Sequence, residues 1–317
     1  MKRVSILIPL YNAAPYVEET IASALAQTYP NIEIIVVDDG STDNSLQLAE
    51  KLSSENVHVF SQPNKGACAA RNLAYEHSTG EYIQYLDADD LLAPDKIEQQ
   101  IAALPADASG EVLSCRWASL YEDKQVVEER CTTLYKNYDN PLNWLADAWM
   151  GKGMFPYHVW LTPRKLIAQA GPWNESLLLN QDGEFFSRVL SGASAIKYCP
   201  ETAVYYRKSN PQSQSQGGKF SRAKAASLLD SYKLYISNVA IYLTNENILK
   251  ALGNNLLLFI YQYHQLFPDL SYQAEEAFQQ LGFKHKWPVG GAQFKKMAIV
   301  LGFKNALRLK ALIQHKY

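Results

Sequence analysis

The stretch VSILIPLYNAAPYVEETIASALAQTYPNIEIIVVDDGSTDNS, residues 4–45, carries the pattern that decides the fold of this chain. Its first residues, Val4–Leu10, form an apolar run of the length of a buried strand. Apolar side chains then recur at helical spacing, and the β-branched run IEIIVVDDG (32–40) predicts a second strand. Ser41 or Thr42 offers an N-cap for a second helix. Strand and helix signals therefore alternate from the start.

The same alternation continues beyond this stretch. VHVF (57–60) predicts a third strand, KGACAARNLAYEH (65–77) a helix, and EYIQYLD (81–87) a fourth strand. Such alternation predicts an α/β fold, a mostly parallel, Rossmann-like sheet with helices on both faces. Ligands of these sheets bind beyond the carboxyl ends of the strands. Asp38–Asp39 and Asp87–Asp90 each follow a strand, so we expect them to face the same crevice.

The later part of the chain has a different pattern. Residues 111–206 mix strand-like runs with helical pieces, and residues 207–218, RKSNPQSQSQGG, have the composition of a loop or linker. Helical signals dominate after that segment. We therefore expect one domain over residues 1–215, with halves at 1–110 and 111–215, followed by a mainly helical region over residues 216–317.

Composition and length indicate a globular protein. The 317 residues are 47% hydrophobic and 20% charged, a balance that can bury a large core. No window approaches about 18 uninterrupted apolar residues, so a transmembrane helix is not expected. The opening MKRVSILIPLYN resembles a first strand and not a signal peptide. The widely spaced cysteines favour the reduced thiols of a cytoplasmic protein over a disulfide or metal framework. They are Cys68, Cys115, Cys131 and Cys199.

Charge is segregated along the chain. No Asp or Glu follows Glu276, so the eight basic residues of the last 41 residues give +8, and the first 276 hold 22 basic and 32 acidic residues, a net −10. Residues 291–317 interleave these cations with apolar side chains, as segments that lie on membrane surfaces do. Two interpretations stay open: the tail docks on an anionic membrane surface, or it packs on the acidic N-terminal domain. No nucleic-acid-binding motif accompanies the charge, so nucleic acid is not expected as a partner.

Three carboxylates, Asp87, Asp89 and Asp90, stand together after the fourth strand, where like charges repel. A turn or a helix cap accounts for one aspartate but not for three nearby anions. Carboxylate oxygens suit hard divalent cations, and Mg²⁺ is commonly held by one or two carboxylates together with substrate phosphates. Binding of Mg²⁺ or Mn²⁺ with a phosphate-bearing ligand is therefore favoured over a solvated loop.

The opening stretch, NKGACAARN (64–72) and YLDADD (85–90) together resemble glycosyltransferase family 2, whose members have the GT-A fold. The resemblance runs from Val4 to about Asp90, with weaker signals as far as Arg207. It implies inverting, metal-assisted transfer of a sugar from a nucleotide diphospho-sugar to a glycan or lipid-linked glycan. UDP-sugars are the default donors, with GDP and dTDP open. It also makes the first half of the domain the donor-binding half and the second the acceptor-binding half.

The resemblance assigns roles to matching positions. Residues near the nucleotide are Pro9, Tyr11, Asp39 and Arg71. Asp87 matches the ribose-facing member of the DxD motif and Asp89 the metal-bound member. Tyr11 could equally be an ordinary strand-end aromatic and Arg71 a charge on a helix surface, but their occurrence in the motif order favours the functional roles.

Inversion needs a base on the far side of the sugar from the diphosphate. NQDGEFFSRVL (180–190) resembles the family segment that supplies it, which makes Asp182 the catalytic base and Glu184 the second candidate. Gln181 stands where the family commonly has Glu. Asp182 could instead simply cap the helix that starts near Gly183.

Further expectations concern the rest of the site. AGPWNESL (170–177) resembles a family stretch with an aromatic residue, so Trp173 is a candidate for contact with a sugar, as is Glu184. Arg207 and Lys208 open a segment that could close over the diphosphate or could be a plain linker. His158 is expected to be structural. The Gln-x-x-Arg-Trp signature of processive synthases does not follow Asp182, so single-sugar transfer is favoured over polymerisation.

Two other classes compete with this interpretation. A non-catalytic nucleotide-sugar-binding protein would keep the crevice but would not need a base. A sugar nucleotidyltransferase needs a Gly- and Arg-rich phosphate loop after its first strand, where this chain has PLYNAAPY (9–16). The glycosyltransferase is therefore favoured over both classes. We expect it in the cytoplasm, peripherally bound to the cytoplasmic membrane face if the tail docks there.

Overall fold

The computed structural model describes residues 1–105, 110–128, 133–153, 155–208 and 221–314. The chain forms two compact units. The first comprises Met1–Trp144, Lys152–Glu175 and Gln181–Gly217. The second comprises Leu145–Gly151, Ser176–Asn180 and Gly218–Tyr317.

The first unit contains a five-stranded sheet in the order β3-β2-β1-β4-β8. Its strands are β1 (Val4–Leu10), β2 (Ile32–Asp38), β3 (Val57–Ser61), β4 (Tyr82–Tyr85) and β8 (Thr162–Pro163). The first four run parallel, and β8 pairs antiparallel with β4. Every residue of β1 and β2 is buried, as continuous apolar runs predict for strands covered on both faces. The predicted α/β fold with a mostly parallel sheet is confirmed.

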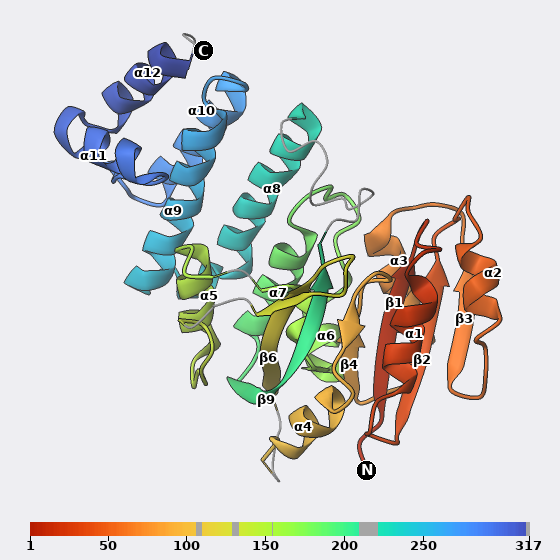
Figure 1. Ribbon diagram of the computed structural model, residues 1–317. Helices are drawn as coiled ribbons and strands as arrows, with labels where there is room; N and C mark the ends of the chain where they lie inside the picture. The colour runs from red at the N-terminus through yellow and green to blue at the C-terminus, as the bar shows by residue number, and fades with distance from the viewer. Residues whose placement is uncertain (106–109, 129–132, 154, 209–220, 315–317) are drawn as a thin grey trace. The chain divides into compact units, whose positions relative to one another are not determined.

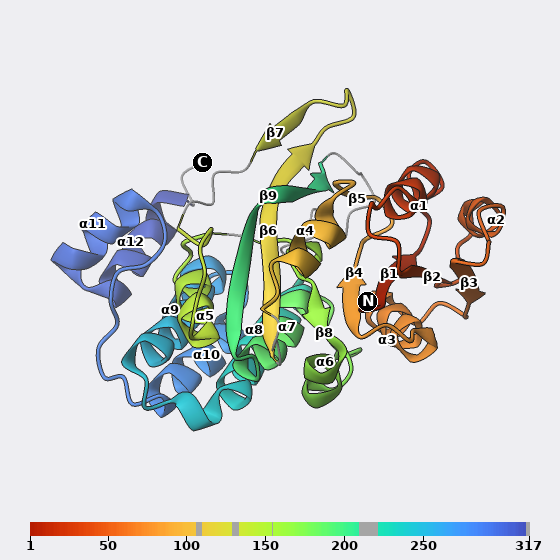
Figure 2. The ribbon, with the colours of Figure 1, turned by 90° about the horizontal axis from the view of Figure 1, so that it is seen from below.

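Helices cover both faces of this sheet. They are α1 (Val17–Leu25), α2 (Ser45–Glu50) and α3 (Ala67–His77). In Figure 2, α1 and α2 lie on one face and α3 lies on the other. Helix α1 turns an apolar stripe inward that includes Val17, Ile21 and Ala24. The loops at the carboxyl ends of the strands are thereby left to form the site.

The predicted cap of α2 is wrong. The helix begins at Ser45, and neither Ser41 nor Thr42 caps it. Instead, Ser41 Oγ accepts a hydrogen bond from the Asn12 N–H at 3.0 Å, and the Thr42 N–H donates to Asn12 Oδ1 at 2.8 Å. Asn12 has φ of 48°, in the left-handed region that asparagine tolerates. These two hydrogen bonds tie the loop after β2 to the turn after β1. Ser41 and Thr42 therefore hold that loop and do not cap α2.

A second sheet of the first unit has the order β5-β9-β6-β7. Its strands are β5 (Leu91–Leu92), β6 (Glu111–Leu120), β7 (Val126–Glu128) and β9 (Ala195–Arg207). β6 and β9 run parallel, and β5 pairs antiparallel with β9, with Leu91 opposite Tyr205. Because β5 directly follows Asp90, this pairing holds the DADD segment (87–90) at the end of β9.

The remaining helical elements described in the first unit frame the same region. They are α4 (Lys96–Ala102), η1 (Tyr157–Val159), α6 (Arg164–Ala170) and α7 (Gln181–Ser191), and α5 (Pro141–Trp149) belongs to both units. Helix α7 buries Phe185, Phe186, Val189 and Leu190, so its first turn is fixed by a packed apolar face.

The second unit is helical, as predicted for the C-terminal region. Its elements are α8 (Arg222–Asn238), η2 (Ala240–Tyr242), α9 (Glu246–Tyr263), α10 (Pro268–Gln280), α11 (Ala292–Leu301) and α12 (Phe303–Gln314). They enclose a core that includes Leu229, Phe259 and Phe278. Across the described residues, none of the helices combines the length and the apolar character that spanning a membrane requires.

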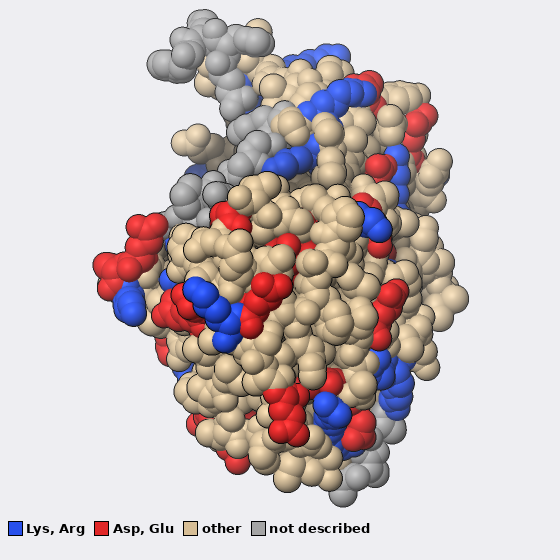
Figure 3. Space-filling view, turned by 90° about the vertical axis from the view of Figure 1, so that its right-hand side faces the viewer, with Lys and Arg blue, Asp and Glu red and all other residues tan. Residues whose placement is uncertain are grey.

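The surface and the thiols add two observations. On the face shown in Figure 3, acidic and basic side chains lie singly or in small groups on a mostly uncharged surface.

Cys68, Cys115 and Cys199 are buried free thiols, and Cys131 lies outside the described residues. Burial raises the pKa of the Cys115 thiol to about 12 and that of Cys199 to about 11, so both stay protonated near neutral pH.

Candidate functional site

The two aspartate-bearing segments meet at one edge of the first sheet. β2 and β4 flank β1, and backbone hydrogen bonds continue the pairing past the strand ends. The Asp39 N–H donates to the carbonyl of Leu10 at 2.8 Å, and the Leu86 N–H donates to the carbonyl of Leu7 at 2.9 Å. The segments after β2 and β4 therefore lie beyond the carboxyl ends of neighbouring parallel strands, where such sheets bind ligands.

Asp39 organises the loop before α3. Its carboxylate accepts hydrogen bonds from Gln62 Nε2 at 2.7 Å, the Lys65 N–H at 2.9 Å and the Gly66 N–H at 2.8 Å. Gly66 has φ of 94°, which glycine adopts without strain. A carboxylate has about four lone-pair sites, so the bonds within the described part of the chain leave about one acceptor site on the buried Asp39.

Arg71 is the centre of the site's polar contacts. Its Nη2 donates to Asp87 Oδ1 at 3.2 Å and to the Tyr157 hydroxyl at 3.1 Å, and its Nη1 donates to Gln181 Oε1 at 3.1 Å. The guanidinium also lies 4.6 Å from the ring centre of Trp173, within the range of a cation–π contact. The hypothesis of a helix-surface charge is wrong, because Arg71 is buried and joins β4, η1 and α7.

Asp87, Asp90 and His158 form a cluster of candidate metal ligands. One ligand atom from each residue lies within 4.8 Å of the others. Asp90 Oδ2 and both ring nitrogens of His158 are buried and have no hydrogen-bond partner among the described residues, although Asp90 Oδ2 lies 3.4 Å from His158 Nδ1. Such orphaned polar atoms are costly unless something coordinates them, so the residues fit a divalent cation.

The charge states of the cluster agree with that fit. Burial lowers the pKa of His158 to about 3, which keeps the imidazole neutral and able to act as a ligand. Burial, with Asp89 and Asp87 nearby, raises the pKa of Asp90. A carboxylate held among other anions in this way is stabilised by a cation.

The sequence favoured a structural role for His158 over a catalytic one, and it did not indicate this cluster. His158 lies about 70 residues after the DADD segment, without a metal-binding spacing that would have revealed it. Asp89, the metal residue expected from the sequence, is not part of the cluster, and its carbonyl accepts a hydrogen bond from Arg207 Nε at 2.7 Å. Its metal role stays a prediction.

Asp182 lies in the first turn of α7, next to the Gln181 side chain that contacts Arg71. It is partly buried, and this burial raises its pKa above that of an ordinary aspartate. The Gly183 N–H and Arg71 oppose the shift by favouring the charged form. The helix N-terminus stabilises the carboxylate as well, so Asp182 can accept a proton without being a free surface group.

Glu184 is in a different position. It is buried, and both of its oxygens accept hydrogen bonds at 2.8 Å from Arg188, through Nε and Nη2. Arg188 in turn donates to the backbone carbonyl of Pro172 at 2.9 Å. The pair therefore anchors the segment before Trp173 to α7.

Trp173 has little surface for a ligand. Its ring is 2% exposed and stacks on Phe185 with the ring centres 4.1 Å apart. With Arg71 also against the ring, Trp173 supports the guanidinium. A contact of Trp173 with sugar stays a prediction.

Arg207 and Lys208 lie at the end of β9. Arg207 Nη2 donates to Glu19 Oε2 at 2.7 Å, and its backbone N–H donates to Asp90 Oδ1 at 2.7 Å. It therefore fixes the DADD segment to α1. Lys208 Nζ lies 4.8 Å from the ring centre of Tyr206. Residues 209–220 lie outside the described residues, and with them the rest of the predicted lid.

Pro9 and Tyr11 lie at the start of the crevice. Pro9 is a buried residue of β1, whereas Tyr11 follows the strand and is 47% exposed. An exposed ring at the carboxyl end of a central strand is free to stack on a planar ligand.

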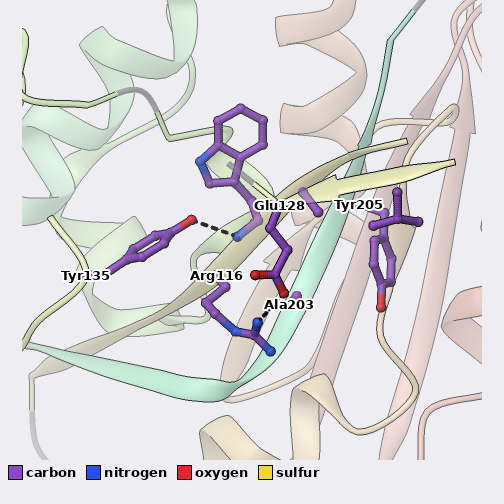
Figure 4. A pocket seen from close by; sticks show the side chains of 8 residues that line it. Arg116, Glu128, Tyr135, Ala203 and Tyr205 are labelled. Atoms are coloured by element: carbon purple, nitrogen blue, oxygen red, sulfur yellow. Dashed lines mark hydrogen bonds and ion pairs between the residues drawn. The ribbon is translucent and has the colours of Figure 1, made fainter. Parts of the chain in front are cut away.

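A separate pocket lies on the second sheet (Figure 4). Its lining residues are Arg116, Trp117, Ala118, Val126, Glu128, Tyr135, Ala203 and Tyr205. Arg116 Nη1 donates to Glu128 Oε1 at 2.6 Å at its rim. Successive residues of a strand point to opposite faces, and Tyr206 stacks on His158 with the ring centres 6.1 Å apart. The pocket therefore lies on the face of β9 opposite His158.

Comparison with known proteins gives a consistent result. The chain matches Glycosyl transferase family 2 over residues 5–156. An uncharacterized glycosyltransferase of Rickettsia felis is 35% identical over 193 residues, 59% of this chain and 31% of that protein. The putative teichuronic acid biosynthesis glycosyltransferase TuaG of Bacillus subtilis is 45% identical over 102 residues, 31% of this chain and 40% of TuaG. The chain thus spans less than half the length of these two relatives.

A solved structure has the same fold. S. aureus TarS 1-349 in complex with UDP-GlcNAc superposes with a TM-score of 0.60 at 18% sequence identity. The likeness covers 91% of this chain and 94% of the TarS chain. At this identity it establishes the fold, the GT-A type expected from the sequence.

Proposed function

Because residues 5–156 match glycosyl transferase family 2, we propose that the protein transfers one sugar, with inversion, from a nucleotide diphospho-sugar to a hydroxyl group. One observation carries this proposal. Arg71 contacts both Asp87, at the end of β4, and Gln181, the first residue of the helix that bears Asp182. Arg71 thus links the carboxylate proposed to bind the donor with the helix turn that carries the proposed base.

The donor proposed is a UDP-sugar. TarS, which shares the fold, has been solved with UDP-GlcNAc, and this supports the choice of nucleotide. Tyr11 would stack on the base, and the remaining acceptor site of Asp39 would take an N–H from the base edge. Asp87 would face the ribose, with Arg71 beside the nucleotide and Pro9 shaping the wall.

A divalent cation would be held by Asp87, Asp90 and His158, with Asp89 of the DxD motif as a further ligand. When bound, the cation neutralises negative charge on the departing diphosphate. Neutral imidazole suits transition metals, and Mn²⁺ also suits carboxylates, so we favour Mn²⁺ over Mg²⁺. Arg207 holds the DADD segment in place through Asp89 and Asp90.

Asp182 would remove the proton from the acceptor hydroxyl. A base works best when its pKa approaches the working pH, and burial shifts the pKa of Asp182 in that direction. Deprotonation strengthens the nucleophile as the bond between the sugar and the diphosphate breaks. Arg71 and the N-terminus of α7 keep the carboxylate ionised before the transfer.

The acceptor proposed is a glycan or a lipid-linked glycan. TuaG is named for teichuronic acid biosynthesis, which supports a polymeric or polymer-precursor acceptor. Lys208 is the candidate that would reach the diphosphate, whereas Arg207, Glu184 and Trp173 would position other parts of the site. We place the enzyme in the cytoplasm, where nucleotide sugars are made, with access to the cytoplasmic membrane face.

A nucleotide-release assay over a panel of donors tests this function. UDP-GlcNAc and other UDP-, GDP- and dTDP-sugars are supplied with Mn²⁺ or with a chelator, and free nucleotide is measured with and without candidate glycan acceptors. We expect Mn²⁺-dependent release with a UDP-sugar. Saturable donor binding without release or transfer for any donor would favour the non-catalytic binding protein instead.

A further inference from the structure

Helices α11 and α12 form a hairpin in the second unit, joined at Gly302 (Figures 1 and 2). Its inner face is packed. Phe294 is buried and lies against Tyr261, with the ring centres 4.7 Å apart. Phe294 also contacts Phe303 across the hairpin at 5.6 Å. The hairpin is therefore an ordered part of the unit, with a fixed outer face.

That outer face is unusually apolar. Six of the seventeen large hydrophobic side chains that are exposed in the described residues lie between residues 299 and 313. They are Ile299, Val300, Leu301, Leu309, Leu312 and Ile313. Ile299 is 73% exposed and Val300 is 79% exposed. Solvent-exposed aliphatic side chains gathered in this way mark a contact surface.

The charges on the same face are all positive. Lys295 and Lys296 precede Ile299 and Val300 by one helical turn and are exposed with them. On α12, Arg308 is exposed one turn before Leu312. These three cations have no ion pair among the described residues, and no acidic residue follows Glu276 anywhere in the sequence.

Exposed aliphatic side chains and exposed cations on the same hairpin together favour one kind of partner. A dry protein interface would bury the lysines at a cost in solvation, and a nucleic acid would leave the aliphatic side chains unused. A bilayer with anionic lipids offers both surroundings, because its headgroup layer is negative and its acyl chains lie a few ångströms deeper.

We propose that the α11–α12 hairpin docks on an anionic lipid bilayer. Ile299, Val300 and Leu312 enter the boundary between headgroups and acyl chains, and the neighbouring cations contact lipid phosphates. The docking does not depend on catalysis. If the proposed function holds, it also brings the enzyme to the surface where lipid-linked acceptors lie.

Flotation of the full-length protein with vesicles tests the proposal. Vesicles of phosphatidylcholine alone are compared with vesicles that also contain phosphatidylglycerol, at low and high salt. We expect binding to the anionic vesicles only, weakened by salt. The double variants Ile299→Ser/Val300→Ser and Lys295→Gln/Lys296→Gln separate the apolar and the electrostatic contributions. Each should weaken binding by about tenfold or more.

Matched controls are available in the same unit. Ile241 is 80% exposed and Lys250 is exposed on α9, so Ile241→Ser and Lys250→Gln remove similar side chains away from the hairpin. Both controls should bind vesicles like the unchanged protein. Equal binding by all variants would overturn the proposal. An absence of binding to any vesicle would also overturn the proposal. Self-association that the hairpin substitutions abolish would overturn it as well, because the surface would then contact a second copy of the chain.

Discussion

Arg71 Nη1 donates a hydrogen bond to Gln181 Oε1 over 3.1 Å, although the two residues stand 110 positions apart in the chain. This bond connects the crevice at the strand ends to helix α7. The Gln at position 181 supplies the acceptor oxygen in this contact. Everything proposed for Asp182 depends on the geometry that this contact maintains.

Replacing Arg71 with lysine should destabilise the fold even though lysine keeps the positive charge. A lysine ammonium cannot span Asp87, Tyr157 and Gln181, and it loses the flat contact with Trp173. We expect the free energy of unfolding to fall by about 2–4 kcal/mol in urea denaturation. Arg222→Lys is the control, because Arg222 pairs with Asp269 on the surface, and this substitution should leave the free energy of unfolding close to that of the unchanged protein. Equal, small effects of the two substitutions would contradict the role of Arg71.

His158→Phe should separate metal binding from stability. The phenyl ring has a similar shape and removes two buried nitrogens that have no hydrogen-bond partner among the described residues. Without metal, we therefore expect a free energy of unfolding within about 1 kcal/mol of the unchanged protein. Mn²⁺ affinity, measured by titration calorimetry, should fall at least about tenfold. Unchanged Mn²⁺ affinity would remove His158 from the metal site.

Glu184→Gln should cost stability and leave the chemistry intact. It breaks a buried, two-bond ion pair and leaves Arg188 without its carboxylate. We expect the free energy of unfolding to fall by about 2–4 kcal/mol. The turnover number of the folded variant should stay within about threefold of the unchanged enzyme. A much larger loss of turnover at normal stability would instead make Glu184 the base.

Lys96 predicts a specific pH dependence. Its side chain is fully buried and hydrogen-bonds to Gln84, and burial lowers its pKa to about 8. As the pH rises through 8, the folded protein loses this proton while the unfolded chain keeps it until about pH 10.5. The unfolded state then binds more protons, so stability rises with pH. Between about pH 7 and pH 10 the gain should be about 2 kcal/mol.

The variant Lys96→Met is the control for that measurement. Methionine has no proton to lose, so the unfolding free energy of Lys96→Met should not show this gain. The difference in unfolding free energy between the unchanged protein and Lys96→Met should therefore change by the amount of the gain over this pH range. Urea denaturation at several pH values gives both curves. Parallel curves would show that Lys96 does not titrate between the folded and unfolded states as described.

The fold was predictable because its signals are local. The buried runs Val4–Leu10 and Ile32–Asp38 are mostly apolar, which is typical of parallel strands covered on both faces. The start of α2 was not predictable, because the side chains of Ser41 and Thr42 hydrogen-bond to Asn12 in the turn after β1. A tertiary contact determined the outcome there, and no local pattern contains it.

The candidate site was predictable only in part, because some of its residues belong to local motifs and others come together only in the folded chain. Asp87 and Asp182 belong to recognisable motifs, whereas His158 becomes a candidate only where η1 brings it to the DADD segment. The i,i+4 spacing of Glu184 and Arg188 could suggest their ion pair, but the burial of Glu184 is visible only in the packed helix. Motifs therefore supplied the candidate residues, and three-dimensional packing showed which of them lie together and which are held in ion pairs.

The most direct test of the account is the rate of sugar transfer by Asp182→Asn. Asparagine keeps the shape of the side chain but cannot accept the acceptor proton. With Asp230→Asn, an exposed substitution in the second unit, as control, the account predicts that Asp182→Asn lowers the turnover number by about 10²–10⁴-fold and leaves UDP-sugar affinity unchanged. Transfer by Asp182→Asn at the unchanged rate would contradict the account.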